Sequence, residues 1–220
     1  MELDFEAILT TLRQSSLYRK LPNSDESSLY QFHSNDYLNL ARHDDLAKMA
    51  ALAINEHGFG STGSRLLSGN YALLESLEHS LADFLGMEQV LVFNSGFQLN
   101  AGVIPTLYGE GDLILADKYC HASLLDGMQL SQATMKRFKH NDMNHLKLLL
   151  ENHRCHFKRC LLVTVSLFSM DGDIAPLDTL QQFTDDYDVD FMVDEAHAIG
   201  VLGDQGRGLC SQFGIKPTYL

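Results

Sequence analysis

Short apolar runs alternate with helix-like stretches along most of this sequence. Apolar residues recur every three or four positions over residues 73–85 and stop before Gly86, which is typical of an amphipathic helix that ends at a glycine. The compact apolar runs predict strands at residues 90–93, 113–116, 135–138, 160–165 and 189–193. Helices are expected between these strands, at residues 98–104, from about Ala122, from about Asp142 and after Pro176. This alternation predicts an α/β fold, with a mostly parallel sheet covered by helices on both faces.

The first 45 residues follow a different pattern. Residues 3–20 have the spacing of one amphipathic helix and residues 29–32 that of a strand, with a polar segment around Pro22 between them. We interpret residues 1–45 as an N-terminal arm and residues 46–220 as part of one large domain. Because a new apolar run begins where the sequence ends, we expect the chain to be a fragment of a longer protein.

Composition narrows the classes of protein to consider. The chain has 220 residues and is 45% hydrophobic, which is enough to bury a substantial core. Its 16 basic and 29 acidic residues give a formal net charge of -13, which would repel a nucleic-acid backbone. No apolar run approaches the roughly 20 residues that span a bilayer, and the N-terminus lacks a signal-peptide pattern. We therefore expect a cytoplasmic protein that binds neither nucleic acid nor membranes.

The cysteines form no metal or disulfide pattern. Four scattered thiols without a C-x-x-C pair are typical of reduced side chains. The stretch His-Arg-Cys-His at residues 153–156 contains metal-binding side chains, but no second cluster lies at the spacing of a zinc finger. We therefore expect no metal site.

The strand at residues 189–193 runs directly into D-E-A-H at residues 194–197. Ligands of parallel α/β sheets bind at the carboxyl ends of strands, so these side chains would lie where chemistry occurs. A D-E-A-H helicase would hold magnesium there, whereas a pyridoxal phosphate enzyme would hold the ring nitrogen of its cofactor with Asp194. The helicase also needs the loop G-x-x-x-x-G-K-[ST]. Residues 58–65 have its glycine spacing, but Ser64 replaces the lysine and Arg65 the hydroxyl, so the helicase interpretation fails.

Pyridoxal phosphate chemistry requires a phosphate cradle, a flat partner for the ring and an anion at the ring nitrogen. Ser95, Gly96 and Phe97 lie between a predicted strand and a predicted helix, where backbone amides and the helix dipole favour a phosphate. His121 follows the next strand and could lie flat on the ring, and Ser169 follows another and could bond a cofactor oxygen. Each feature alone also fits a plain connector, a polar histidine or a turn cap, but together they occupy successive strand ends.

The ordered set of motifs closely resembles the α-oxoamine synthases, which are fold-type I pyridoxal phosphate enzymes. The matching segments are N-D-Y-L at 35–38, G-S-R at 63–65, S-G-F at 95–97, H-A-S at 121–123, F-K-H-N-D at 138–142, S-M-D-G-D-I-A-P-L at 169–177, D-E-A-H-A-I-G-V-L-G at 194–203 and G-R-G at 206–208. The resemblance implies pyridoxal 5'-phosphate as the cofactor. It also implies that the large cofactor-binding domain continues past Leu220 and is followed by a small C-terminal domain.

The resemblance also implies roles for individual residues. The cofactor-binding set would be Ser95, Gly96, Phe97, His121, Ser169, Asp194 and His197. Asp194 would pair with the protonated pyridine nitrogen, while His197 and Ser169 would bind around the phenolic oxygen of the ring. His121 would stack on the ring and meet the substrate, which makes Asp194, His197 and His121 the expected catalytic residues. Arg19 would bind the substrate carboxylate, although its position fits a solvated arginine at a helix end equally well.

Within the family, the motifs look most like the homodimeric member that condenses L-alanine with a pimeloyl thioester, of coenzyme A or acyl carrier protein, in biotin synthesis. The alternatives are the 2-amino-3-ketobutyrate CoA ligase, 5-aminolevulinate synthase and serine palmitoyltransferase types, or a non-catalytic subunit of such an enzyme. Two departures stand out. Val165 occupies a position where the family usually has glutamate, and the lysine that anchors the cofactor would lie just beyond Leu220. We therefore expect the 220-residue chain alone to have little or no activity.

Overall fold

The computed structural model describes residues 4–21 and 32–220. Contacts between residues divide the chain into two units, Met1–Ala41 and Arg42–Leu220. The predicted strand at residues 29–32 lies outside the described residues, except for Phe32, which is part of a turn. Among the described elements, the second unit contains the sheet and every helix except the first.

The first helix, α1, covers Phe5–Gln14 and is shorter than predicted. It begins at Asp4, whose carboxylate accepts a hydrogen bond from the Ala7 amide at 3.1 Å. The predicted helix at residues 3–20 is wrong beyond Gln14. The Ser15 hydroxyl bonds back to the helix there, and Ser16 adopts a positive φ of 57°, which a right-handed helix does not allow.

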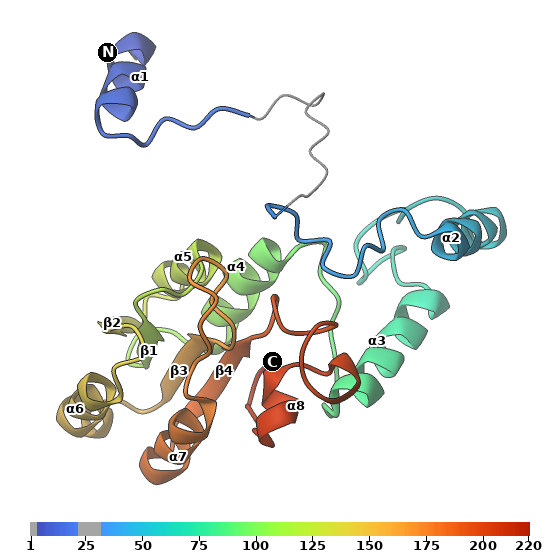
Figure 1. The fold of residues 1–220 in the computed structure, drawn as a ribbon. Helices are drawn as coiled ribbons and strands as arrows, with labels where there is room; N and C mark the ends of the chain where they lie inside the picture. The colour runs from blue at the N-terminus through green and yellow to red at the C-terminus, as the bar shows by residue number, and fades with distance from the viewer. Residues whose placement is uncertain (1–3, 22–31) are drawn as a thin grey trace. The chain divides into compact units, whose positions relative to one another are not determined.

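Four parallel strands form one sheet within residues 32–220 (Figure 1). The strands are β1 (Leu113–Asp117), β2 (Thr134–Phe138), β3 (Cys160–Val165) and β4 (Asp190–Asp194), in the spatial order β2-β1-β3-β4. Every residue of the two inner strands, β1 and β3, is buried. That burial explains why their sequences, apart from Asp117 and Thr164, are apolar rather than alternating. The predicted α/β fold class is confirmed.

Helices cover both faces of the sheet (Figure 1). They are α4 (Gly96–Leu107) and α5 (Ala122–Leu130) on one face, and α6 (Met143–His153) and α7 (Leu177–Tyr187) on the other. The two helices α4 and α5 pack very closely, because a side chain at Gly127 would collide with the backbone carbonyl of Asn100. This contact fixes the distance between the amino-terminal turns of both helices, which face the same edge of the sheet.

In the described part of the chain, the remaining elements are three helices and two short 3-10 turns. They are α2 (Asp44–His57), α3 (Ala72–Leu85), α8 (Leu209–Phe213) and two 3-10 turns, η1 (Arg154–His156) and η2 (Asp204–Gly206). The predicted glycine stop of α3 is confirmed, since Gly86 has a left-handed conformation with φ 68°. The predicted strand at residues 90–93 is wrong: the Val92 amide donates to the Glu78 carboxylate at 2.8 Å, where a strand would need a neighbouring backbone. Among the described helices, none is long and apolar enough to cross a membrane.

Candidate functional site

The carboxyl ends of the strands and the start of α4 border a cavity of about 650 Å³, a size typical of small-molecule sites. Six of the predicted site residues line it: Gly96, Phe97, His121, Ser169, Asp194 and His197. Ser95 lies next to it as the N-cap of α4. Arg19 belongs to the other unit of the chain, so its role stays a prediction. The structure thus brings together side chains separated by up to about a hundred residues, because parallel strands end at one edge of the sheet.

Asp194 is the last residue of β4 and is half-buried at the cavity. Its carbonyl accepts from the Ser166 amide at 2.9 Å, which fixes the backbone against the end of β3. Its carboxylate oxygen Oδ1 accepts from the Ala196 amide at 2.9 Å. Asp194 therefore does cap the turn after its strand, but this uses only one carboxylate oxygen. A rigidly held carboxylate at the cavity favours a positively charged group beside it.

The amino-terminal turn of α4 provides hydrogen-bond donors. The Ser95 hydroxyl accepts from the Gln98 amide at 3.2 Å and so starts the helix. The amides of Gly96 and Phe97 belong to the first turn, where no carbonyl within the helix can accept from them. A Cβ at Gly96 would meet no atom within 4 Å, so a ligand can approach this backbone. Free first-turn amides at the positive end of a helix dipole form an anion-binding site.

His121 is held in one orientation at the start of α5. Its Nδ1 accepts from the Ser123 amide at 3.2 Å and lies 2.8 Å from the Ser123 hydroxyl. That hydroxyl in turn accepts from the side-chain amide of Asn100 at 2.9 Å. Because a backbone amide only donates, Nδ1 is the acceptor, and the ring proton lies on Nε2. The network therefore presents a neutral imidazole with an N–H donor available to a ligand.

Sequence reasoning did not identify Asn100 and Ser123 as parts of the site. Both side chains are buried, with 7% and 2% of their surface exposed. Ser123 is the last residue of the H-A-S motif at residues 121–123, but the motif alone predicts no role for its hydroxyl. The signal that could have suggested a network was the presence of two small polar residues on the inner faces of helices that pack closely.

Apolar side chains also line the cavity. Phe168 and Val165 are buried beside it, and Phe97 contributes an exposed ring. Val165 pairs in register with Asp194, so the departure from glutamate places a hydrocarbon group next to that carboxylate. Burial, together with the neighbouring carboxylate of Asp117, raises the pKa of the Cys120 thiol far above its ordinary value. Cys120 is thus a neutral wall residue and not a nucleophile.

The loop after β3 carries Ser169. Leu167 and Ile174 form an antiparallel bridge across it, and the Phe168 amide donates to the Asp173 carbonyl at 2.9 Å. Gly172 turns the chain with φ 72°, a conformation that strongly favours glycine. The loop therefore has a defined shape and holds Ser169 at the cavity.

The two other polar residues of the D-E-A-H segment differ in role. His197 lines the cavity and is half-buried. Glu195 is 3% exposed, and its carboxylate accepts from the Leu209 and Cys210 amides at 2.9 and 2.7 Å. Glu195 therefore caps α8 and links it to the turn after β4, which is a structural role.

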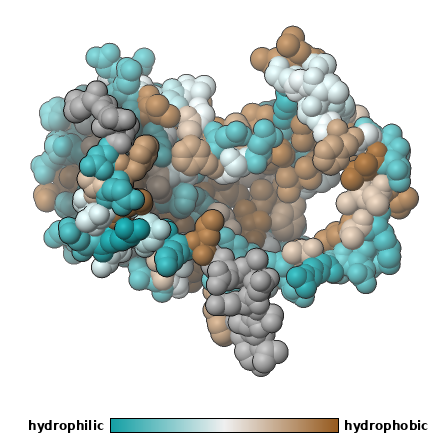
Figure 2. Space-filling model, turned by 90° about the horizontal axis from the view of Figure 1, so that it is seen from above, coloured by the Kyte–Doolittle hydropathy of each residue, from teal (hydrophilic) through white to brown (hydrophobic). Residues whose placement is uncertain are grey.

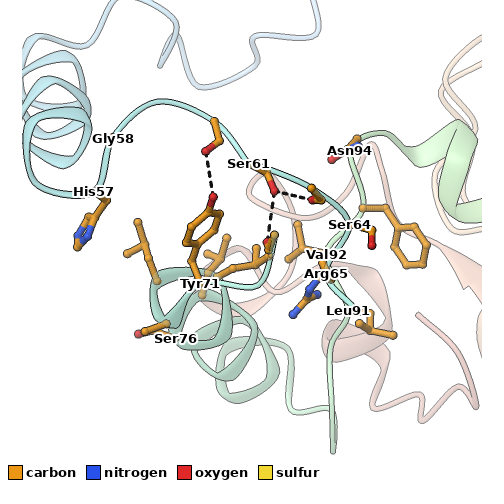
Figure 3. A pocket seen from close by; sticks show the side chains of 18 of the residues that line it. His57, Gly58, Ser61, Ser64, Arg65, Tyr71, Ser76, Leu91, Val92 and Asn94 are labelled. Atoms are coloured by element: carbon orange, nitrogen blue, oxygen red, sulfur yellow. Dashed lines mark hydrogen bonds between the residues drawn. The ribbon is translucent and has the colours of Figure 1, made fainter. Parts of the chain in front are cut away.

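A second cavity, of about 980 Å³, lies among residues 57–65, α3 and residues 91–98 (Figure 3). The Tyr71 ring lies under the glycine-rich loop, and the Ser61 hydroxyl donates to the Gly63 carbonyl at 2.9 Å. A side chain at Gly69 would collide with that same carbonyl. Close packing of residues 61–69 against one another therefore explains why residue 69 is a glycine, and no nucleotide phosphate is needed to explain it. Arg65 also lines this cavity, and its guanidinium pairs with Glu78 of α3.

Large apolar side chains are exposed around this second cavity. Figure 2 shows both hydrophobic and hydrophilic residues around the open space at the right of the molecule. The most exposed large apolar residues of the segment 58–70 are Phe59, Leu66 and Leu67, with 90%, 96% and 86% of their surface accessible. Contiguous exposed apolar surface is typical of an interface with another chain.

In the described part of the chain, no group of three or more histidine, cysteine, aspartate or glutamate side chains could hold a metal ion.

Comparison with known proteins identifies related sequences. Residues 28–214 match the family "Aminotransferase class I and II". A protein of Acaryochloris marina named "Putative 8-amino-7-oxononanoate synthase" is 44% identical over 224 residues, covering 98% of this chain and 57% of that protein. The 8-amino-7-oxononanoate synthase of Geobacter sulfurreducens is 44% identical over 217 residues, covering 94% and 55%. The chain spans about half the length of the curated relatives it matches.

Solved structures resemble this one in fold. Serine palmitoyltransferase of Sphingomonas wittichii superposes with a TM-score of 0.79 at 36% identity, covering 82% of this chain and 45% of that chain. Serine palmitoyltransferase of S. paucimobilis, solved with pyridoxal phosphate and myriocin bound, gives a TM-score of 0.80 at 29% identity, covering 96% and 57%. The 8-amino-7-oxononanoate synthase of Francisella tularensis gives 0.70 at 34% identity, covering 84% and 50%.

Proposed function

We propose, from the premise that this chain belongs to the aminotransferase class I and II family, that it forms a pyridoxal 5'-phosphate site. The observation that carries this proposal is the cavity itself: an aspartate at a strand end, the free amides of a helix start and an oriented imidazole all face it. The relatives named 8-amino-7-oxononanoate synthase support a reaction in biotin synthesis. In that reaction L-alanine and a pimeloyl thioester would give 8-amino-7-oxononanoate, CO2 and the free thiol of the acyl carrier.

The residues present fit this cofactor. Asp194 offers the anion for a protonated ring nitrogen, and the amides of Gly96 and Phe97 offer donors for the phosphate. Ser169 and His197 would bind around the phenolic oxygen of the ring. When bound, the cofactor supplies an electron sink that stabilises negative charge on the α-carbon of the amino acid.

The protein would act through position and charge. Asp194 would keep the proton on the ring nitrogen, because an opposite charge in contact favours the charged form. His121 would stack on the ring and donate from Nε2 to an oxygen of the substrate, since its Nδ1 is engaged by Ser123. The apolar side chains of Val165 and Phe168 would exclude water from that face of the cavity.

The choice of amino acid and acyl thioester separates this proposal from the alternatives. The structural similarity to serine palmitoyltransferases makes a different substrate pair the second candidate. The test is an assay of a protein of the relatives' length that contains this sequence, with alanine, glycine and serine against pimeloyl, acetyl, succinyl and palmitoyl thioesters. Preference for alanine and the pimeloyl group is expected. Preference for serine with palmitoyl, or glycine with a short acyl group, would contradict the biotin assignment.

We further propose that the 220-residue chain alone has little synthase activity, because the cofactor-anchoring lysine expected from the family resemblance is outside it. The same assay with the isolated chain tests this. Robust turnover, or borohydride fixation of the cofactor to a lysine such as Lys118 or Lys216, would contradict it.

The four free thiols fit a reducing compartment, and we propose the cytoplasm.

A homodimer is the proposed assembly. The exposed apolar side chains around residues 58–70 support it, because a surface of this kind is stabilised when another chain covers it. The alternative, a non-catalytic subunit that binds a complete partner, would use the same surface. Analytical ultracentrifugation of the chain separates a self-association from a monomer, and co-purification with a longer homologous chain would favour the subunit.

A further inference from the structure

The imidazole of His140 lies between two carboxylates. Its Nδ1 is 2.9 Å from Asp117 Oδ1, and its Nε2 is 2.7 Å from Asp173 Oδ2. The three residues come from three different places: the end of β1, the loop after β2 and the loop after β3. One side chain thus joins three successive strand ends at the edge of the sheet that carries the cofactor cavity.

The other hydrogen bonds decide where the protons are. The Asp117 carboxylate also accepts from the Tyr119 and Asn141 amides, at 2.7 and 2.9 Å, and it is fully buried. The Asp173 carboxylate accepts from the Asn141 side-chain amide at 2.8 Å. Both carboxylates are therefore acceptors, and both ring nitrogens of His140 must donate. Only the protonated imidazolium has two N–H donors.

The charges around the ring favour this form. Within the described residues, the titratable groups that face it are Asp117 of β1, Tyr119 of the following turn and Asp173 of the loop after β3. Burial lowers the pKa of His140, but the hydrogen bonds and negative charges of Asp117 and Asp173 outweigh burial and leave the pKa above its ordinary value. The imidazolium offsets one of two negative charges that would otherwise repel each other.

The ring also contacts the cavity wall directly. Tyr119 stacks on it with ring centroids 4.3 Å apart, and Phe168 meets it edge-on at 4.5 Å. Both aromatic residues line the cavity. His140 contacts the Asp173 carboxylate, and the backbone carbonyl of Asp173 accepts from the Phe168 amide. This second hydrogen bond closes the loop that carries Ser169.

We propose that His140, as an imidazolium, is a positioning residue that holds Tyr119 and the loop at residues 168–173 in place and so shapes one wall of the cofactor cavity. This inference rests on the proposed cofactor site for its consequence, but not for the state of His140. Loss of the imidazolium proton would leave a ring nitrogen facing a carboxylate and would loosen the loop.

The experiment uses the 220-residue chain without cofactor. NMR of ¹⁵N-labelled histidine gives the protonation state and pKa of His140, and hydrogen exchange gives the protection of the Phe168 and Gly172 amides. The Asp173→Asn variant keeps the size of the side chain and removes one negative charge. It should lower the pKa of His140 by about one unit or more, because an opposite charge in contact accounts for shifts of that size. Asp171→Asn removes a charge from the same loop without a contact to His140 and should have less than half of this effect.

The loop should respond together with the ring. We expect the protection of the Phe168 and Gly172 amides to fall about tenfold in Asp173→Asn, while Thr164 in β3 keeps its protection. In the original sequence the same fall should occur as pH rises through the pKa of His140. A neutral His140 in the folded protein at pH 6, or loop protection that ignores its titration, would overturn the proposal.

Binding of pyridoxamine 5'-phosphate, an analogue that cannot condense with lysines, separates this inference from the proposed function. An affinity that falls with the loss of the His140 proton supports the full proposal. An affinity that follows neither His140 nor Asp173→Asn, with the loop responding as expected, overturns the link to the cavity. If the analogue does not bind at all, the cofactor site fails, while the titration and exchange data still test the role of His140 in the loop.

Discussion

Replacing Ser123 with alanine removes the hydroxyl that joins Asn100 to His121. Asn100 is 7% exposed, and its side-chain amide donates to this hydroxyl at 2.9 Å. Without it, a buried N–H group loses its acceptor, and leaving such a group unsatisfied costs about 1–3 kcal/mol. The Ser123 side chain is itself 2% exposed, so water cannot easily replace the hydroxyl. We therefore expect Ser123→Ala to lower the free energy of unfolding by about 1–3 kcal/mol.

Urea denaturation followed by circular dichroism measures this change. With an m-value of about 2 kcal/mol/M, the midpoint should fall by about 0.5–1.5 M without a change in slope. Ser80→Ala is the matched control, because its hydroxyl is exposed on α3 and donates only to the carbonyl of Ser76. That substitution should change stability by less than about 0.5 kcal/mol. Equal midpoints for the two variants would refute the reasoning.

The same substitution tests the orientation of His121. In the original chain, NMR of the imidazole should show the proton on Nε2, since the Ser123 amide donates to Nδ1. Ser123→Ala keeps that amide and removes the hydroxyl, so the tautomer should persist while the ring becomes more mobile. Observation of a proton on Nδ1 in the original chain would contradict the proposed donor role of Nε2.

Three further outcomes are expected. Gly127→Ala should destabilise the chain by about 1–3 kcal/mol in urea, because its Cβ would collide with a carbonyl of α4, whereas Gly102→Ala, with open space around it, should stabilise by up to about 1 kcal/mol. The pKa of His140 is raised in the folded chain, so the charged imidazolium stabilises the fold. This stabilisation is complete below the ordinary pKa of histidine and is lost as pH rises through the raised value. The difference in unfolding free energy between the original chain and His140→Gln should therefore shrink over that pH range. Leu66→Glu should weaken self-association in sedimentation experiments by at least about tenfold, and Leu148→Glu, at an exposed position on α6, should not.

The sheet could be predicted because its inner strands are buried on both faces and leave a continuous apolar signal in the sequence. The segment at residues 90–93 has the same signal but is not a strand. There the Glu78 carboxylate, 14 residues earlier, takes the Val92 amide. Local periodicity does not contain that information, because a side chain on another element supplies the acceptor.

The site was predictable to the extent that it consists of strand ends. Asp194 and His121 follow apolar runs, and parallel strands end at one edge, so their meeting at one cavity follows from the fold. The supporting residues were not predictable. Asn100 reaches Ser123 only because Gly127 lets two helices pack closely, and the partners of His140 lie 23 and 33 residues away in sequence. Such contacts depend on packing geometry that no motif spacing encodes.

The central claim is that the Asp194 carboxylate holds the proton on the ring nitrogen of the cofactor. The most direct measurement is the ¹⁵N chemical shift of ring-labelled pyridoxamine 5'-phosphate bound to the chain, followed across pH. The account predicts that binding raises the pKa of the ring nitrogen by about 1–3 units, that Asp194→Asn abolishes this rise, and that Asp178→Asn, an exposed acid on α7, leaves it intact. The same ring-nitrogen pKa in the original chain and in Asp194→Asn would contradict the claim.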